Sequence, residues 1–152
     1  MITDTNVWLS RWPTRRLPLD ETPELVRTLQ SLHITDAWAA SLDGLLHHDL
    51  RSVNRRTVKE CQQHGQGVLR PVAVINPALP GWQDDLDDCL QLGIRIIRLL
   101  PGWHGWTLQS PEFRQLLQTA APHRLLLQIC LRLEDPRIQH SLLQIPDVDP
   151  TP

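Results

Sequence analysis

The sequence predicts an α/β fold with a parallel β-sheet, and three observations support this class. Five apolar segments with strand composition alternate along the chain with segments of helical periodicity. Residues 94–100 form a run of branched aliphatic side chains, which is typical of a strand buried on both faces. Strand–helix alternation gives parallel strands joined by right-handed crossovers. Such a sheet takes one of two forms, an open doubly wound sheet or a closed (β/α)8 barrel.

Length and composition bound the type of protein. The 152 residues leave room for one domain, residues 1–152, with a sizeable core. A net charge of -2 predicts neither nucleic acid nor an anionic membrane as a partner. No apolar run is long enough to span a bilayer, and the N-terminus does not resemble a signal peptide. The three cysteines are widely separated, which disfavours a disulfide framework. We therefore expect a cytoplasmic protein.

The first strand is expected at residues 1–9. Side chains alternate along a strand, so Asp4, Asn6 and Trp8 share one face. A polar inward row on a first strand predicts a lined cavity rather than a plain core. An irregular connection over residues 10–19 leads to a helix over 22–32, with Thr22 as the N-cap and Pro23 as the first helical residue.

The middle of the chain repeats this alternation. A second strand is expected at residues 34–42, a polar helix at 49–64 and a third strand at 68–76. A third helix is expected at 80–92, with its acidic residues on a solvated outer face. Gly65 and Gly93 suit left-handed positions at the ends of the two helices.

The fourth strand, at residues 94–100, leads to the strongest functional candidates. Pro101 and Gly102 stop the strand, and a loop with Trp103 and His104 follows. In α/β enzymes the chemistry lies beyond the carboxyl ends of parallel strands. His104 is a candidate for proton transfer or ligand binding, because imidazole titrates near neutral pH. The alternative is a hydrogen-bonded loop histidine beside tryptophans that pack in the core.

The remaining elements complete the predicted alternation. Ser110 begins a helix that runs to about residue 120, and a fifth strand is expected at 125–133. A short helix is expected at 138–143, and residues 145–152 are expected to lack regular structure. No glycine-rich phosphate loop follows the first strand, which disfavours a nucleotide-binding open sheet.

Further candidates lie on or beside the strands. Arg98 and Arg132 would bind a substrate carboxylate if they point inward, or would pair with Asp4 or Glu134. Cys130 is either a small buried hydrophobic residue or a thiolate ligand. His47 or His48 together with His104 and His140 would be needed for a new metal site, and we prefer surface positions for the first two.

Several separated segments carry a family resemblance. They are residues 2–9 (ITDTNVWL), 11–13 (RWP) and 15–17 (RRL), then 93–95 (GIR), 98–99 (RL) and 101–105 (PGWHG), and finally 133–137 (LEDPR) with 139–140 (QH). In this order they resemble the amidohydrolase-related family of metal-dependent hydrolases, which have TIM barrels. The resemblance implies a partial (β/α)8 barrel of about five parallel strands with flanking helices, because a closed barrel takes eight strands and ~250 residues.

The resemblance also implies a function and a site. It implies hydrolysis of a C–N or C–O bond in a small-molecule substrate, with Asn6, Arg98 and His104 as catalytic candidates. The substrate-binding candidates are Asp4, Trp8, Trp103 and Arg132.

A zinc-type divalent metal is implied by the family alone. The usual paired histidines of the family's first strand are replaced here by Asn6 and Trp8, so we assign no metal ligand. The alternative function is a non-catalytic or truncated barrel that binds a ligand or a protein partner. An open sheet edge also predicts a homo-oligomer that covers it.

Overall fold

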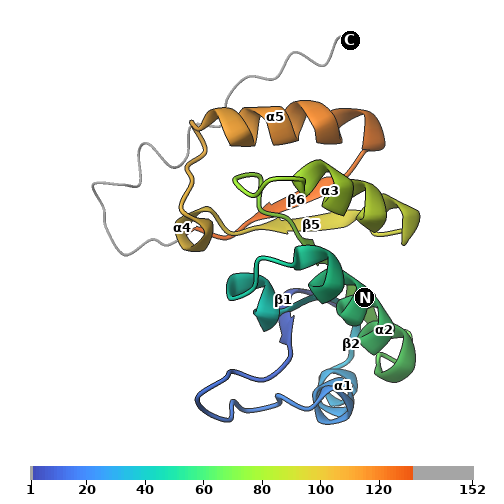
Figure 1. The fold of residues 1–152 in the computed structure, drawn as a ribbon. Coiled ribbons are helices and arrows are strands. Elements are labelled where there is room, and N and C mark those ends of the chain that lie inside the picture. Colours follow the sequence, from blue (N-terminus) through green and yellow to red (C-terminus); the bar gives the residue numbers. More distant parts are fainter. Residues whose placement is uncertain (1, 132–152) are drawn as a thin grey trace.

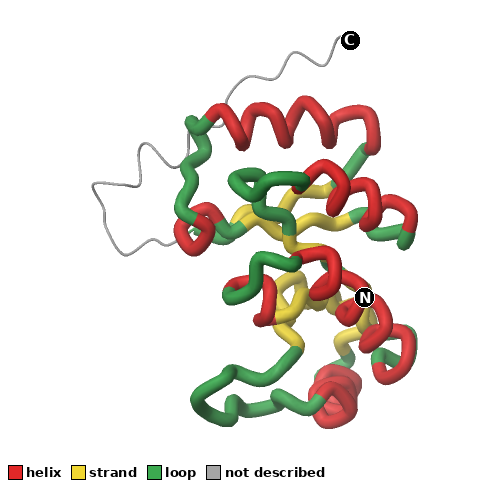
Figure 2. The backbone as a smooth tube through the Cα atoms, in the orientation of Figure 1, coloured by secondary structure: helices red, strands yellow, loops and turns green. Residues whose placement is uncertain are grey.

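The computed structural model describes residues 2–131 and shows an α/β protein with two three-stranded parallel sheets and flanking helices (Figures 1 and 2). One sheet has the order β1-β2-β3 and the other has the order β4-β5-β6. All strand pairings in the described residues are parallel, as predicted, and these residues form no closed barrel. The strands are β1 (Ile2–Leu9), β2 (Ile34–Ser41), β3 (Leu69–Pro71), β4 (Ala73–Val74), β5 (Ile96–Leu99) and β6 (Leu126–Ile129).

Helices connect these strands and cover one face of each sheet. The α-helices are α1 (Thr22–Ser31), α2 (Leu50–His64), α3 (Trp82–Gln91), α4 (Pro101–His104) and α5 (Pro111–Ala120), and the 3-10 helices are η1 (Leu42–Leu45) and η2 (Ala121–His123). Figure 1 shows α3 and α5 on the same side of the sheet that contains β5 and β6. No helix within residues 2–131 is long and apolar enough to cross a bilayer.

The predicted third strand, residues 68–76, is divided between the two sheets. β3 pairs with β2, whereas β4 pairs with β5, and only Val72 separates β3 from β4. The Val72 N–H still donates to the Ala39 carbonyl at 2.9 Å, so the pairing with β2 continues for one more residue. β2 then ends at Ser41 and turns into η1. The β4 backbone is therefore left without a neighbouring strand on this side.

The side chain of Asn54, on α2, takes the place of that missing strand. Its Nδ2 donates to the Val74 carbonyl at 2.9 Å, and the Val74 N–H donates to its Oδ1 at 2.8 Å. Asn54 is 1% exposed, so water cannot replace these two hydrogen bonds. A single amide group from a helix thus satisfies both backbone groups of Val74 where the two sheets separate.

Alternation along the strands divides the core into helix-facing and sheet-facing sides. Ile97 and Leu99 of β5 belong to the cluster that packs on α3 and α5. Val7 and Leu9 of β1 belong to a second cluster with α1 and α2. The opposite faces of the two sheets share a third cluster, which contains Ala40, Val72, Val74, Ile96 and Leu100, with Trp8, Trp38 and Cys130 packed against it. The faces without helices therefore pack toward each other and form an interior.

Several local predictions need correction. The segment after Pro101 is the short helix α4 rather than a loop, because backbone N–H groups of residues 103–105 donate to the carbonyls of residues 100 and 101. The N-cap of α1 is Glu21, not Thr22, and it makes no side-chain capping bond. Gly65 has φ -74° and is not left-handed, whereas Gly93 has φ 77° as predicted. The predicted helix at 138–143 and the tail at 145–152 lie outside the described residues.

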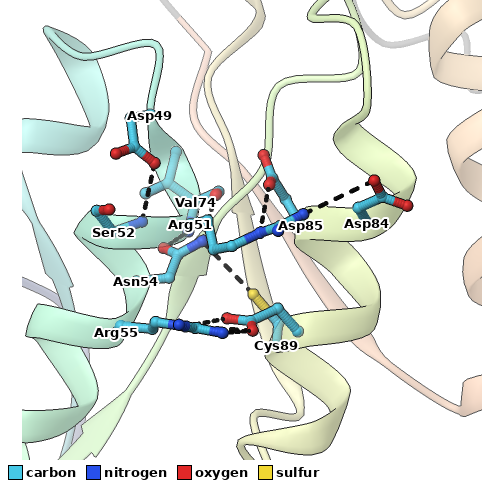
Figure 3. A network of polar contacts seen from close by, with 10 residues as sticks. Asp49, Arg51, Ser52, Asn54, Arg55, Val74, Asp84, Asp85 and Cys89 are labelled. Atoms are coloured by element: carbon cyan, nitrogen blue, oxygen red, sulfur yellow. Dashed lines mark hydrogen bonds and ion pairs between the residues drawn. The ribbon is translucent and has the colours of Figure 1, made fainter.

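The acidic residues of α3 are only partly a solvated face (Figure 3). Arg51 of α2 lies 3.3 Å from the Asp85 carboxylate, and Arg55 binds Asp88 through two of its nitrogens. Asp88 is 9% exposed, and its hydrogen bonds from Arg55 lower the pKa of its carboxyl group. Three of the four acidic residues of α3, Asp84, Asp85 and Asp88, therefore form ion pairs with arginines of α2.

Candidate functional site

A cavity of about 510 Å³ lies at the carboxyl ends of β1, β5 and β6. We call it the mouth pocket. Two tryptophans line it, Trp8 from β1 and Trp103 from α4, and its polar groups are the amides of Asn6 and Gln128 and the thiol of Cys130. Leucine and isoleucine side chains from η1, from the end of β5 and from the end of β6 complete the wall. The residues that enclose this space come from segments more than 100 positions apart in the chain.

Arg98, on β5, lies directly behind this pocket and is fully buried at 0% exposure. Its Nε donates to Gln128 Oε1 at 2.7 Å, and its carbon Cζ lies 4.5 Å from the centre of the Trp8 ring. Both contact residues line the mouth pocket. Burial lowers the pKa of Arg98, but an arginine with this many hydrogen bonds stays protonated at neutral pH.

An irregularity between β1 and β2 explains the position of the Arg98 guanidinium. The register shifts between Asp4 and Val7, which interrupts the ladder with β2. Arg98 Nη2 donates to the carbonyls of Thr5 at 3.0 Å and Trp38 at 3.2 Å, and Nη1 donates to the Val7 carbonyl at 3.0 Å. Gln128 Nε2 donates to the same Thr5 carbonyl at 2.7 Å. Two side chains from β5 and β6 thus bind the backbone of β1 and connect the two sheets.

His104 lies at the end of α4, one residue after Trp103. Its Nε2 is 2.9 Å from the Gly44 carbonyl, and a carbonyl only accepts, so Nε2 carries the proton. Its Nδ1 is buried and has no hydrogen-bond partner within the described residues. Burial lowers the pKa of His104, and the hydrogen bond to Gly44 partly opposes this shift. The imidazole is therefore neutral at pH 7, with Nδ1 as its acceptor.

Gly44 allows this contact because the chain passes close to β4 there. A Cβ atom at this position would lie 2.6 Å from Val74 Cγ2, which is closer than real Cβ contacts. The close approach brings the Gly44 carbonyl within reach of His104. It also packs η1 against β4 beside the mouth pocket.

Apart from His104, which binds the Gly44 carbonyl and does not line the mouth pocket, the predicted site residues fall into three groups. Asn6, Trp8 and Trp103 line the mouth pocket together, and Arg98 lies behind it. Asp4 is partly buried, and its carboxylate accepts a hydrogen bond from the Asn6 backbone N–H at 3.0 Å, outside the pocket wall. The third group, Arg132, Glu134 and His140, lies outside the described residues.

Gln128 is the site residue that the sequence reasoning missed. Gln128 lies on β6, two positions before Cys130, which directly follows the last residue of the strand, so the alternation of side chains places both on one face. That spacing is the signal in the sequence that points to Gln128, because Cys130 is a candidate ligand. Polar residues inside an apolar strand are costly to bury unless they are hydrogen-bonded, and Gln128 is bonded at both ends of its amide.

The described residues do not fit a metal site of the kind that the resemblance implies. Within residues 2–131, three or more His, Cys, Asp or Glu side chains nowhere gather closely enough to hold a metal ion. At the mouth pocket the donors are two amides and a single thiol, and burial raises the pKa of that thiol. His47 and His48 are exposed, as predicted, and His104 uses Nε2 for Gly44.

The other described cavity with comparable size is more polar. It has a volume of about 450 Å³ and lies between the ends of β1 and β2, the start of α1 and one face of α2. Its charged groups are largely paired by Arg11 with Glu21 and by Arg16 with Asp20. The Ser10 and Ser41 hydroxyls at its inner end are hydrogen-bonded to each other at 2.8 Å. The mouth pocket therefore remains the stronger candidate.

The three cysteines should differ in reactivity. Burial raises the pKa of Cys61 and of Cys89 to about 12, so almost no thiolate forms there at pH 8. Cys130 lines the mouth pocket and is only half-buried. We expect iodoacetamide to modify Cys130 first in the native protein, as measured by peptide mass spectrometry. Equal labelling of all three cysteines in folded protein would contradict this assignment.

Comparison with known proteins gives no relative from which a function could be transferred. No protein-family model matches the chain, and searches of curated proteins and of solved structures gave no significant match.

Proposed function

We propose that this chain binds a small molecule in the mouth pocket, and that it is part of a (β/α)8-type barrel related to the amidohydrolases. The observation that carries the binding function is the pocket itself. Its wall contains two tryptophan rings and two side-chain amides, and it lies at the carboxyl ends of parallel strands, where α/β proteins bind their ligands.

The order of the strands supports the barrel relationship. The strands follow one another in chain order within both sheets, β1-β2-β3 and β4-β5-β6, and only Val72 separates the two sets. A doubly wound sheet instead reverses its strand order at a switch point. Within the described residues β6 lies at the edge of its sheet, and pairing of a second copy with this edge remains our proposal for a homo-oligomer.

The polar groups of the pocket favour binding over metal-dependent hydrolysis. Asn6 and Trp8 stand where the family has paired histidines, and neither is a strong ligand for a zinc-type metal. Amide groups and aromatic rings instead orient a ligand and contribute apolar contact area. We therefore place ligand binding before the hydrolase function that the resemblance implies.

The Trp8→Ala variant tests this function. A panel of small aromatic and aliphatic compounds is screened by thermal shift and by protection of Cys130 from iodoacetamide. We expect hits that protect Cys130, and we expect Trp8→Ala to weaken them at least ~10-fold because half of the aromatic wall is lost. Trp12→Ala removes a tryptophan outside the pocket and should leave binding unchanged. No protecting compound, or equal binding by Trp8→Ala, would refute the proposal.

Hydrolysis is a second candidate, favoured by the neutral imidazole of His104. Its neighbour in the chain, Trp103, lines the mouth pocket, and the buried Nδ1 of the neutral imidazole can accept a proton from a water molecule that enters beside it. Ester and amide panels would be tested with His104→Gln as the comparison. Turnover that His104→Gln abolishes while ligand binding persists would support hydrolysis. Equal turnover by both proteins would exclude His104 as the base.

A further inference from the structure

The mouth pocket has a feature that specifies its ligand more closely, namely an uncharged lining in front of a buried positive charge. No Asp, Glu, Lys or Arg within the described residues lines the pocket. Arg98 lies behind two of the lining residues, 4.5 Å from the Trp8 ring centre and 2.7 Å from Gln128 Oε1. A charge a few ångströms behind an apolar wall acts strongly, because little water screens it.

The groups around Arg98 do not neutralise this charge within the wall. Its hydrogen-bond acceptors are three backbone carbonyls and the Gln128 amide, all of them uncharged. Two titratable groups of the described chain interact with it electrostatically, Cys130 and Asp4. Burial keeps the Cys130 thiol protonated at neutral pH. The Asp4 carboxylate attracts Arg98 from outside the pocket wall, where it is partly exposed and accepts a hydrogen bond from the Asn6 backbone N–H.

The two tryptophans indicate the shape of the ligand. Trp8 has the Arg98 guanidinium over its ring and also lines the pocket, and Trp103 lines the pocket from α4. Flat apolar groups pack well against such rings. Asn6 is exposed at the rim of the mouth pocket, and its side-chain amide can donate a hydrogen bond to a carboxylate.

We propose that the mouth pocket selects a small aromatic monocarboxylate over its neutral analogue, with the ring against the tryptophans and the carboxylate on the side of Asn6 and Gln128. This inference rests on the proposed function, because it requires that the pocket binds a small molecule. The buried Arg98 charge acts through space and needs no direct contact with the ligand.

The experiment compares phenylacetate with phenylacetamide, which has the same shape but no charge, by calorimetry on the full chain at pH 7. We expect phenylacetate to bind about tenfold more tightly than phenylacetamide. Equal or tighter binding of phenylacetamide would overturn the inference but leave the binding function in place. Absence of binding by both compounds, with no hit in the wider panel, would instead refute the proposed function.

A nearly isosteric variant provides the second readout. Asn6→Asp adds a negative charge at the rim without changing the size of the side chain. We expect it to abolish the preference for phenylacetate, measured as the ratio of the dissociation constants of phenylacetate and phenylacetamide. Gln115→Glu adds the same charge on the exposed face of α5, away from the pocket, and should keep the preference. An unchanged preference in Asn6→Asp would count against the proposed orientation.

Discussion

Arg98→Met is expected to lower the free energy of unfolding by about 3 kcal/mol. The substitution removes the Arg98 donor from the carbonyls of Val7 and Trp38 and from Gln128 Oε1. The Thr5 carbonyl also loses it but keeps the hydrogen bond from Gln128 Nε2. Each buried polar group without a partner costs about 1–3 kcal/mol, and the apolar methionine recovers part of the loss because it removes a buried charge. The backbone carbonyls cannot be removed by mutation, so the loss cannot be fully compensated.

Urea unfolding followed by tryptophan fluorescence measures this effect. A loss of this size is a large share of the ~5–15 kcal/mol that stabilises a typical domain. Arg98→Lys is the matched control, because it keeps the positive charge. Its single ammonium group replaces the planar guanidinium, which donates to four acceptors. We expect lysine to restore less than half of the loss. A midpoint for Arg98→Met equal to that of the unmodified protein would show that the guanidinium does not hold the sheets together.

Asn54→Leu is expected to destabilise the fold by about 3–4 kcal/mol, because it leaves both backbone groups of Val74 unpaired. Leucine has a similar volume, so the loss reports hydrogen bonding rather than a cavity. Thr57→Val on the same helix is the control. Thr57 is also buried, but its hydroxyl bonds only the Val53 carbonyl of its own helix, so we expect a loss below ~1 kcal/mol.

Asn54→Asp separates the two hydrogen bonds and gives a pH dependence. The ionised carboxylate keeps the bond from the Val74 N–H but opposes the Val74 carbonyl, so the folded protein raises the pKa of the new carboxyl group. The protonated form can donate to that carbonyl. We therefore expect this variant to lose stability as pH rises above ~4, the pKa of an unfolded aspartate. A stability that does not change with pH relative to the unmodified protein would contradict the paired geometry.

Arg98 and Asn54 have related roles, because each replaces pairing that a strand cannot supply. Asn54 acts where β2 has ended and the third predicted strand passes from one sheet to the other. Arg98 acts where β1 slips against β2, and it connects β1 to β5 and β6. The charge that we propose to attract a ligand is thus held by contacts that stabilise the fold. A change at Arg98 would affect both, which is why the binding test uses Asn6.

The strand pattern could be predicted from the sequence because each strand carries its own signal. The branched run at residues 94–100 and the alternation at 1–9 depend only on neighbouring residues. The same alternation placed Asn6 and Trp8 on one face, and both line the mouth pocket. The helix α4 could not be foreseen, because four residues with a proline and a glycine carry too little periodicity to distinguish a helical turn from a loop.

By itself, the sequence determined the order of strands and helices, the parallel pairing and the inward face of β1, since these follow from local periodicity and from the length of the connections. Only the tertiary structure decided the partners of Arg98, the pairing of Asn54 with Val74 and the place of Gln128 in the site. These contacts join residues 20 to 123 positions apart. The packing of the two sheets decides which buried groups come into contact across such separations in the sequence. The residues next to them in the chain carry no signal for these contacts.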